Sequence, residues 1–141
     1  MGLAEKRALK AFQEEHYAKC LASVARIARK EVPIDVEWDA LAAHISPEKA
    51  HKYWNESFFL PVVTALEKIA ADSFGRDSLQ EQLVRIRIKG NSRHVFQVSW
   101  KTGALTLDLM MCDDQAVGGP DTKTYKDRVA AITSCLEENL G

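Results

Sequence analysis

The side chains in this chain that could bind a metal ion fall into two groups with regular spacing. His16 and Cys20 stand four residues apart in a segment typical of a helix, which lets two ligands share one metal ion. Asp35, Glu37 and Asp39 alternate along an expected strand and offer the carboxylate oxygens that Mg²⁺ or Mn²⁺ prefers. Residues two apart on a strand, however, lie about 6.6 Å from each other, and a histidine and a thiol in an apolar stripe usually serve packing. We therefore predict no metal site and no cofactor.

No catalytic nucleophile is predicted either. The serines lack a G-x-S-x-G elbow, and no cysteine stands at a recognisable helix N-terminus that would lower the pKa of its thiol. Residues 118–121 lead into a helix as a phosphate loop does, but they lack the lysine and the spacing of a P-loop, and Asp121 would repel an anion. The sequence names no catalytic residue, and whether the chain is an enzyme stays open.

The remaining histidines are assigned no chemistry. His44 and His51 flank the expected start of a helix and are predicted to face solvent. His94 begins a strand on the side expected to face the core, where a buried neutral imidazole is a more common role than a general base.

Two segments far apart in the chain have matching patterns. Residues 34–39 alternate apolar with acidic side chains, and residues 84–89 alternate apolar with basic ones, both at the period of a strand. We predict that residues 34–38 pair with residues 84–88, in a direction left open. Their outer face would carry a candidate charge ladder of Asp35, Glu37, Asp39, Arg85, Arg87 and Lys89. Such pairs set register and partner more than they add stability, at about 0.2–1 kcal/mol each.

Three long helices are expected, at about residues 4–29, 48–71 and 122–139, from apolar residues recurring every three or four positions. In the second helix, Trp54, Phe58 and Val62 fall on one face and should be buried, while Pro61 should kink or break the helix. Gly75 should end this helical region, and Asp77 can cap one short turn after it.

Short turns at residues 90–92 and 102–103 predict that residues 84–111 form a three-stranded meander. Together with the edge strand at 34–38 it would make a single antiparallel sheet of about four strands, with the long helices packed on one face. The predicted fold class is α+β. In this arrangement the last strand has a free outer edge, and Thr106, Asp108 and Met110 are the candidate edge-strand interface.

Composition limits the class of protein. The chain has 141 residues, 46% of them hydrophobic and 28% charged, as in one globular domain that buries its own core. We expect neither a signal peptide nor a membrane span, and three scattered cysteines suggest a reduced, cytoplasmic protein. A net charge of −1, with basic and acidic stretches in alternation, makes nucleic acid an unlikely partner.

By elimination, the sequence predicts a non-enzymatic protein-interaction or self-associating module, acting as a homodimer or with another protein. If the dimer does not use the edge strand, the long N-terminal helix is the next expected place. One alternative is a small-molecule-binding protein or enzyme with a pocket between helices and sheet, walled by Trp38, Tyr53, Trp54 or His94. Another is nucleic-acid binding through residues 85–89.

Overall fold

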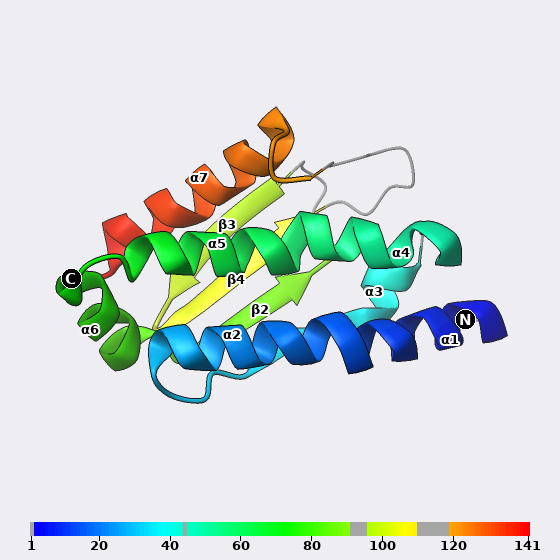
Figure 1. The fold of residues 1–141 in the computed structure, drawn as a ribbon, viewed down its shortest axis with the longest axis horizontal. Helices are drawn as coiled ribbons and strands as arrows, with labels where there is room; N and C mark the ends of the chain where they lie inside the picture. The colour runs from blue at the N-terminus through cyan, green and yellow to red at the C-terminus, as the bar shows by residue number, and fades with distance from the viewer. Residues whose placement is uncertain (1, 44, 91–95, 110–118) are drawn as a thin grey trace.

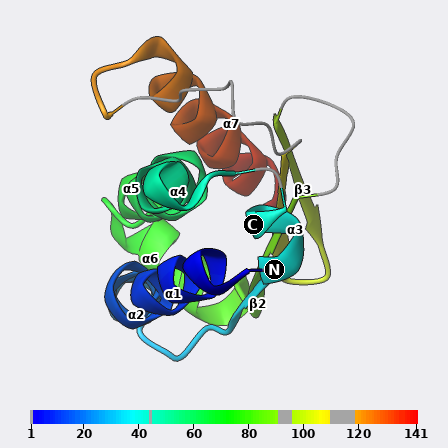
Figure 2. The same cartoon turned by 90° about the vertical axis from the view of Figure 1, so that its right-hand side faces the viewer.

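The computed structural model of the 141-residue chain describes residues 2–43, 45–90, 96–109 and 119–141. A layer of helices covers one face of a four-stranded sheet (Figure 1), and the side view separates these two layers (Figure 2). The elements, with η for a turn of π-helix, are α1 (Leu3–Phe12), η1 (Gln13–Tyr17), α2 (Ala18–Ala28), β1 (Ile34–Val36), α3 (Trp38–Ala42), α4 (Pro47–Trp54), η2 (Asn55–Phe59), α5 (Leu60–Ile69), α6 (Ser73–Gln82), β2 (Arg85–Lys89), β3 (Phe96–Lys101), β4 (Ala104–Leu109) and α7 (Lys123–Asn139). The predictions for His44, His94, Met110 and Cys112 fall outside the described residues.

The first three elements form one continuous helical rod. At the junctions the backbone stays in the right-handed helical region, with φ −63° at Phe12 and −61° at Ala18. In η1 the N–H groups bond one residue further back than in an α-helix, so the rod widens locally without a break. The rod ends at Arg29, whose φ of +58° is left-handed. The expected long N-terminal helix is confirmed, with a π-turn that its sequence did not indicate.

The acidic and basic segments pair as neighbouring strands, as predicted, and the pairing is parallel. The register places Ile34 opposite Ile86, Asp35 opposite Arg87 and Val36 opposite Ile88. The acidic strand is shorter than expected, however, because it ends at Val36 and Trp38 already opens α3. Asp39 therefore lies in a helix and is not part of a strand face.

The predicted antiparallel meander is wrong, because the sheet is mixed. Its order is β1-β2-β4-β3, with β2 parallel to β1 and to β4, and only β3 antiparallel to its neighbour. The more apolar strand takes the central place: Leu105, Leu107 and Leu109 of β4 are all fully buried. The inward side chains of β3, by contrast, are only partly buried. An inner strand has a paired strand on each side, so its core-facing side chains are enclosed more fully than those of an edge strand such as β3.

The turn between β3 and β4 is confirmed as a tight hairpin. Thr102 and Gly103 have φ of +52° and +82°, as in the two-residue turns that match strand twist. A Cβ at Gly103 would lie 2.8 Å from the Gln82 carbonyl oxygen. The Gly103 carbonyl accepts a bond of 2.8 Å from the N–H of Val84, which ties the hairpin to the start of β2.

The prediction at Pro61 was a kink or a break; the second rod, α4-η2-α5, has no break there, and a π-turn ends directly before the helix that contains the proline. A proline in a helix leaves the carbonyl four residues earlier without its N–H donor, here that of Ser57. η2 ends directly before α5, and the Ser57 carbonyl accepts instead from Nη1 of Arg128 at 3.4 Å. Trp54, Phe58 and Val62 are buried, as expected.

Arg128 of α7 is buried within the helical layer, with only 4% of its surface exposed. Its guanidinium carbon lies 5.2 Å from the centroid of the Phe96 ring. Burial lowers the pKa of Arg128, and Tyr53 raises it in part. The side chain thus joins α7 to both η2 and β3 through charge-assisted and cation–π contacts.

α6 begins before Gly75 rather than after it. The carboxylate of Asp72 accepts a bond of 2.8 Å from the N–H of Gly75, a standard N-terminal cap. Gly75 therefore lies within the first turn. A Cβ there would lie 1.6 Å from the Ile69 carbonyl oxygen, so glycine is needed for close approach to α5 and does not act as a stop signal.

Candidate interaction surface on the N-terminal helix

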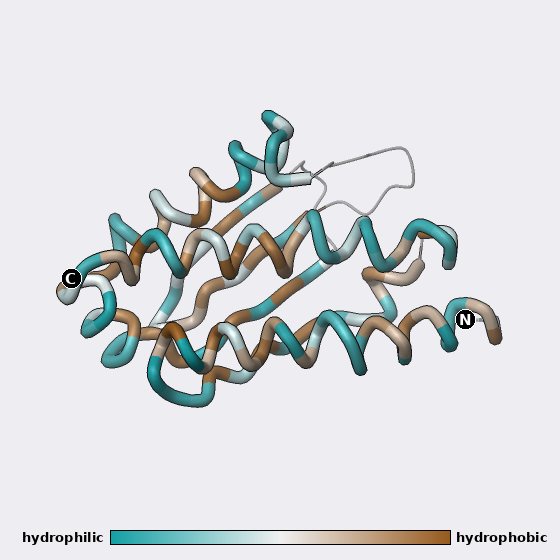
Figure 3. The backbone as a smooth tube through the Cα atoms, viewed as in Figure 1, coloured by the Kyte–Doolittle hydropathy of each residue, from teal (hydrophilic) through white to brown (hydrophobic). Residues whose placement is uncertain are grey.

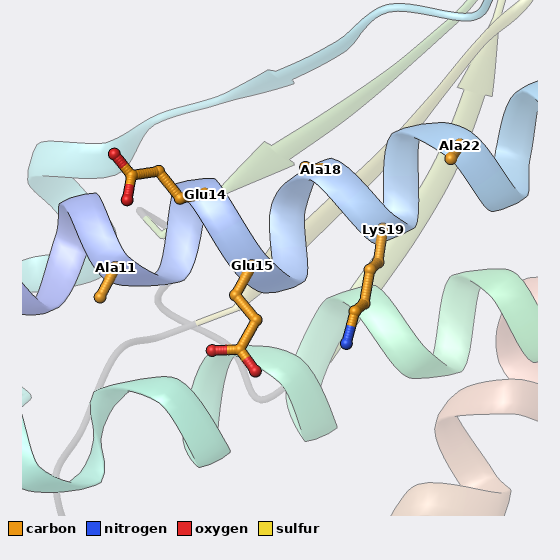
Figure 4. A pocket seen from close by; sticks show the side chains of 6 residues that line it. All are labelled: Ala11, Glu14, Glu15, Ala18, Lys19 and Ala22. Carbon is orange, nitrogen blue, oxygen red and sulfur yellow. The ribbon is translucent and has the colours of Figure 1, made fainter.

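The outward side of the first helical rod carries a shallow hollow of about 590 Å³. We call it the outer helix face; it is lined by Ala11, Glu14, Glu15, Ala18, Lys19 and Ala22. All six side chains are exposed, and Figure 4 shows them along the rod. The hollow arises because three of the six positions hold alanine, whose side chain barely rises above the helix backbone.

The sequence dictates which side of the rod faces outward. Phe12, Cys20, Val24 and Ile27 are buried, and they anchor the opposite side against the rest of the helical layer. The Cys20 thiol donates to the carbonyl of Phe59 at 3.9 Å, and burial raises its pKa to about 12. Cys20 is therefore a packing residue in its protonated form.

Along the rod, the positions on the outer helix face are evenly spaced about the point between His16 and Tyr17, although Figure 4 shows Glu14 and Lys19 on opposite sides of the helix. Ala11 corresponds to Ala22 about this point. The two remaining correspondences are Glu14 with Lys19 and Glu15 with Ala18. A second copy of the rod laid antiparallel across this point would therefore meet the same six positions in reverse order. This is the pattern of an isologous two-fold contact.

Charge on the outer helix face is divided along its length. The half nearer the N-terminus carries Glu14 and Glu15, and the other half carries Lys19. Figure 4 shows Glu15 and Lys19 directed to the same side of the rod and Glu14 to the other. Glu14 has one ion pair along its own helix, with Lys10 at 3.9 Å, and both side chains are largely exposed. An antiparallel copy would place the acidic half of each rod against the basic half of the other.

The charge ladder predicted between the two strands is present only in part. Asp35 contacts the Nε atom of Arg85 at 3.2 Å, and it lies opposite Arg87 in the register. Lys89 lies opposite Asp108 of β4. These cations therefore have carboxylates on the adjacent strands, which reduces their use as a nucleic-acid surface.

The predicted edge-strand interface loses its basis. Thr106 lies between Arg87 and Ser99, and Asp108 lies between Lys89 and Gln97, because β4 is an inner strand. Met110 is outside the described residues. In the described sheet the edge next to β4 belongs to β3.

Two of the predicted pocket walls are in contact with each other, since the ring centroids of Trp38 and Trp54 lie 6.3 Å apart. Tyr53 and Trp54 are buried, and the indole N–H of Trp54 donates to the Leu41 carbonyl at 3.1 Å. Trp38 is partly exposed and lines an open hollow of about 520 Å³ with its sequence neighbours 36–40. That hollow lies at the end of β1 and not between the helices and the sheet.

A cluster that the sequence did not indicate lies beside the outer helix face. Ligand atoms of Glu15, His16 and His51 all lie within 4.8 Å of one another. His51 comes from α4, so no spacing in the sequence could have joined it to η1. The outer helix face itself did leave a signal, the seven-residue interval between Ala11 and Ala18.

Comparisons of the chain with protein-family models, with curated proteins and with solved structures returned no match. Among the described residues, the helices are all too short or too polar to cross a membrane.

Proposed function

We propose that this chain is a protein-interaction module that forms a homodimer through the outer helix face. The observation that carries the proposal is the spacing of the six lining positions along the rod, which pairs Ala11 with Ala22, Glu14 with Lys19 and Glu15 with Ala18. The proposed contact therefore lies on the N-terminal helix, the second place that the sequence suggested, and not on the strand edge that was predicted first.

Geometry and charge support this contact in different ways. Alanines let two helices approach to the short end of the usual 8–10 Å interaxial distance. Exposed ion pairs across the contact add about 0.2–1 kcal/mol each and chiefly select the antiparallel orientation. A rod of some 26 residues is about 39 Å long, which gives room for contact on both sides of the hollow.

Sedimentation velocity on the wild-type chain at rising concentration tests the proposal. Ala18→Arg places a long charged side chain near the two-fold point and should leave a monomer. Ala130→Arg is the matched control, because Ala130 is exposed on α7, away from this face. A strict monomer for the wild type at high micromolar concentration, or a dimer that survives Ala18→Arg, would exclude the contact.

A charge exchange tests the orientation. Lys19→Glu should weaken the dimer, because both halves of the face become acidic. Glu14→Lys and Glu15→Lys combined with Lys19→Glu should restore affinity, since each half then again meets a half of opposite sign. An equal loss in the single and the triple variant would contradict the antiparallel arrangement.

A further inference from the structure

Three potential metal ligands converge where the N-terminal rod crosses α4. Glu15 and His16 come from η1, and His51 comes from the other helix. Their ligand atoms lie within 4.8 Å of one another. Figure 4 shows Glu15 extending from its helix toward the neighbouring helical rod, while Glu14 points away from it.

The π-turn explains how two consecutive residues serve one site. Adjacent side chains of an α-helix diverge strongly around the helix axis. The wider π-turn rotates each residue by a smaller angle, so Glu15 and His16 diverge less than they would in an α-helix. Single π-turns in α-helices occur frequently at functional sites.

The orientation of His51 is fixed by the backbone. Its Nε2 lies 2.9 Å from the Ala8 carbonyl oxygen, and a carbonyl can only accept. Nε2 therefore carries the proton, and in the neutral ring Nδ1 keeps its lone pair. Histidine ligands are commonly held by such a bond from the second ring nitrogen, which sets the tautomer and the ring direction.

The ring of Phe12 packs against the imidazoles of both His16 and His51. Its ring centroid lies 5.2 Å from that of His16 and 5.7 Å from that of His51, and Phe12 itself is fully buried. The two imidazole centroids are 5.7 Å apart and nearly perpendicular. Both imidazoles thus pack against the buried ring of Phe12. The side chains of His16 and His51 stay partly exposed, so an ion can reach them from solvent.

We propose that Glu15, His16 and His51 bind one divalent transition-metal ion of the zinc class. Two imidazoles and a carboxylate suit Zn²⁺, Co²⁺ or Ni²⁺, whereas Mg²⁺ and Ca²⁺ prefer oxygen ligands alone. Zinc bonds to nitrogen and carboxylate oxygen are about 2.0–2.2 Å long, so the three side chains would draw together around the ion. Three protein ligands leave a fourth position for water or another ligand. The ion would fasten the N-terminal rod to α4.

Zinc titration of the untagged, metal-stripped chain, by calorimetry or competition with a chelating dye, tests this site. Wild type should bind one ion, and His51→Ala and Glu15→Gln should each lose about tenfold or more in affinity, since even indirect partners of a ligand cost that much. Glu14→Gln is the matched control, with the same charge change on the adjacent residue, and should bind as wild type. Co²⁺ in place of zinc should give the visible absorption of a low-coordinate site in wild type and not in His51→Ala.

Equal zinc affinity in wild type, His51→Ala and Glu15→Gln, or no binding in any of them, would overturn the site. The site does not depend on the homodimer, although Glu15 belongs to both surfaces. Ala18→Arg should keep zinc binding while it removes the dimer, and His51→Ala should keep the dimer while it weakens zinc binding. Sedimentation of the same samples therefore separates a failure of one proposal from a failure of the other.

Discussion

Phe58 is the side chain at which burial matters most plainly for stability, since it is completely enclosed within the helical core. Phe58→Ala removes this packing and leaves a cavity, so the free energy of unfolding should fall by about 3–5 kcal/mol. Phe74→Ala is the control: Phe74 is 84% exposed, and its loss should change stability by no more than about 0.5 kcal/mol. Urea denaturation of both variants measures the difference, and similar losses would contradict the described packing.

Cys20 should make stability sensitive to alkaline pH. Burial raises the pKa of its thiol from 9.0 to about 12, so above pH 9 the unfolded chain loses this proton while the folded chain keeps it. The contribution of Cys20 is complete below pH 9 and is lost as the pH rises toward 12. The free energy of unfolding, measured by denaturation at each pH, should fall more steeply above pH 9 for wild type than for Cys20→Ala. If it falls equally in both, the thiol of Cys20 does not keep its proton through burial.

What the sequence predicted at this scale depended on local spacing. The burial of Trp54, Phe58 and Val62 followed from steps of four along one helix. The approach of His51 to η1 could not be predicted, because it depends on how two rods cross and not on any interval in the chain.

Among the helices and turns, α6 depends on a glycine within its first turn. Gly75→Ala would bring a methyl group into the Ile69 carbonyl oxygen and should cost about 1–3 kcal/mol or more. Gly119→Ala is a suitable control, since no atom lies within 4 Å of a Cβ at that position. Thermal unfolding of the two variants should separate them clearly. A tolerated Gly75→Ala would mean that α5 and α6 lie further apart than described.

The paired charged strands carry a weaker prediction. Arg87→Glu would place an acid opposite Asp35, and the free energy of unfolding should fall by about 1 kcal/mol at most, because both side chains are exposed. Equilibrium denaturation measures it at low and high salt, with the smaller effect at high salt. A loss of several kcal/mol would show that Arg87 serves a buried network.

The strands themselves were predictable, but their order was not. Alternating apolar residues show which side chains of each strand face the core. These core-facing side chains are the same in a meander and in the observed mixed sheet, so the alternation does not reveal the strand order. The pairing of β1 with β2 could be anticipated, because complementary charges on the two strands indicated the partner, but the direction of the pairing and the register of Ile34 opposite Ile86 could not. The choice of β4 over β3 as the neighbour of β2 depends on total buried area, which a local pattern does not contain.

For the whole molecule, the proposed homodimer links stability to concentration. A dimer that forms only from folded chains raises the melting temperature as protein concentration rises. Wild type should show this increase, and Ala18→Arg should melt at one temperature throughout. Calorimetry over a wide concentration range measures it, with Ala130→Arg expected to follow wild type. A melting temperature independent of concentration in wild type would oppose self-association.

The parallel pairing of β1 with β2 also bears on the order of events during synthesis. β1 leaves the ribosome long before its neighbour, since more than forty residues separate the two strands. β2 in turn is completed on its other side by β4, which emerges after β3. The helical rods and the β3–β4 hairpin depend on contacts between residues close in sequence and can form early. The four-stranded sheet is complete only after β4 has been synthesised. Until then, the apolar sides of both rods have no sheet to cover them, and the nascent chain is exposed to aggregation through most of its translation.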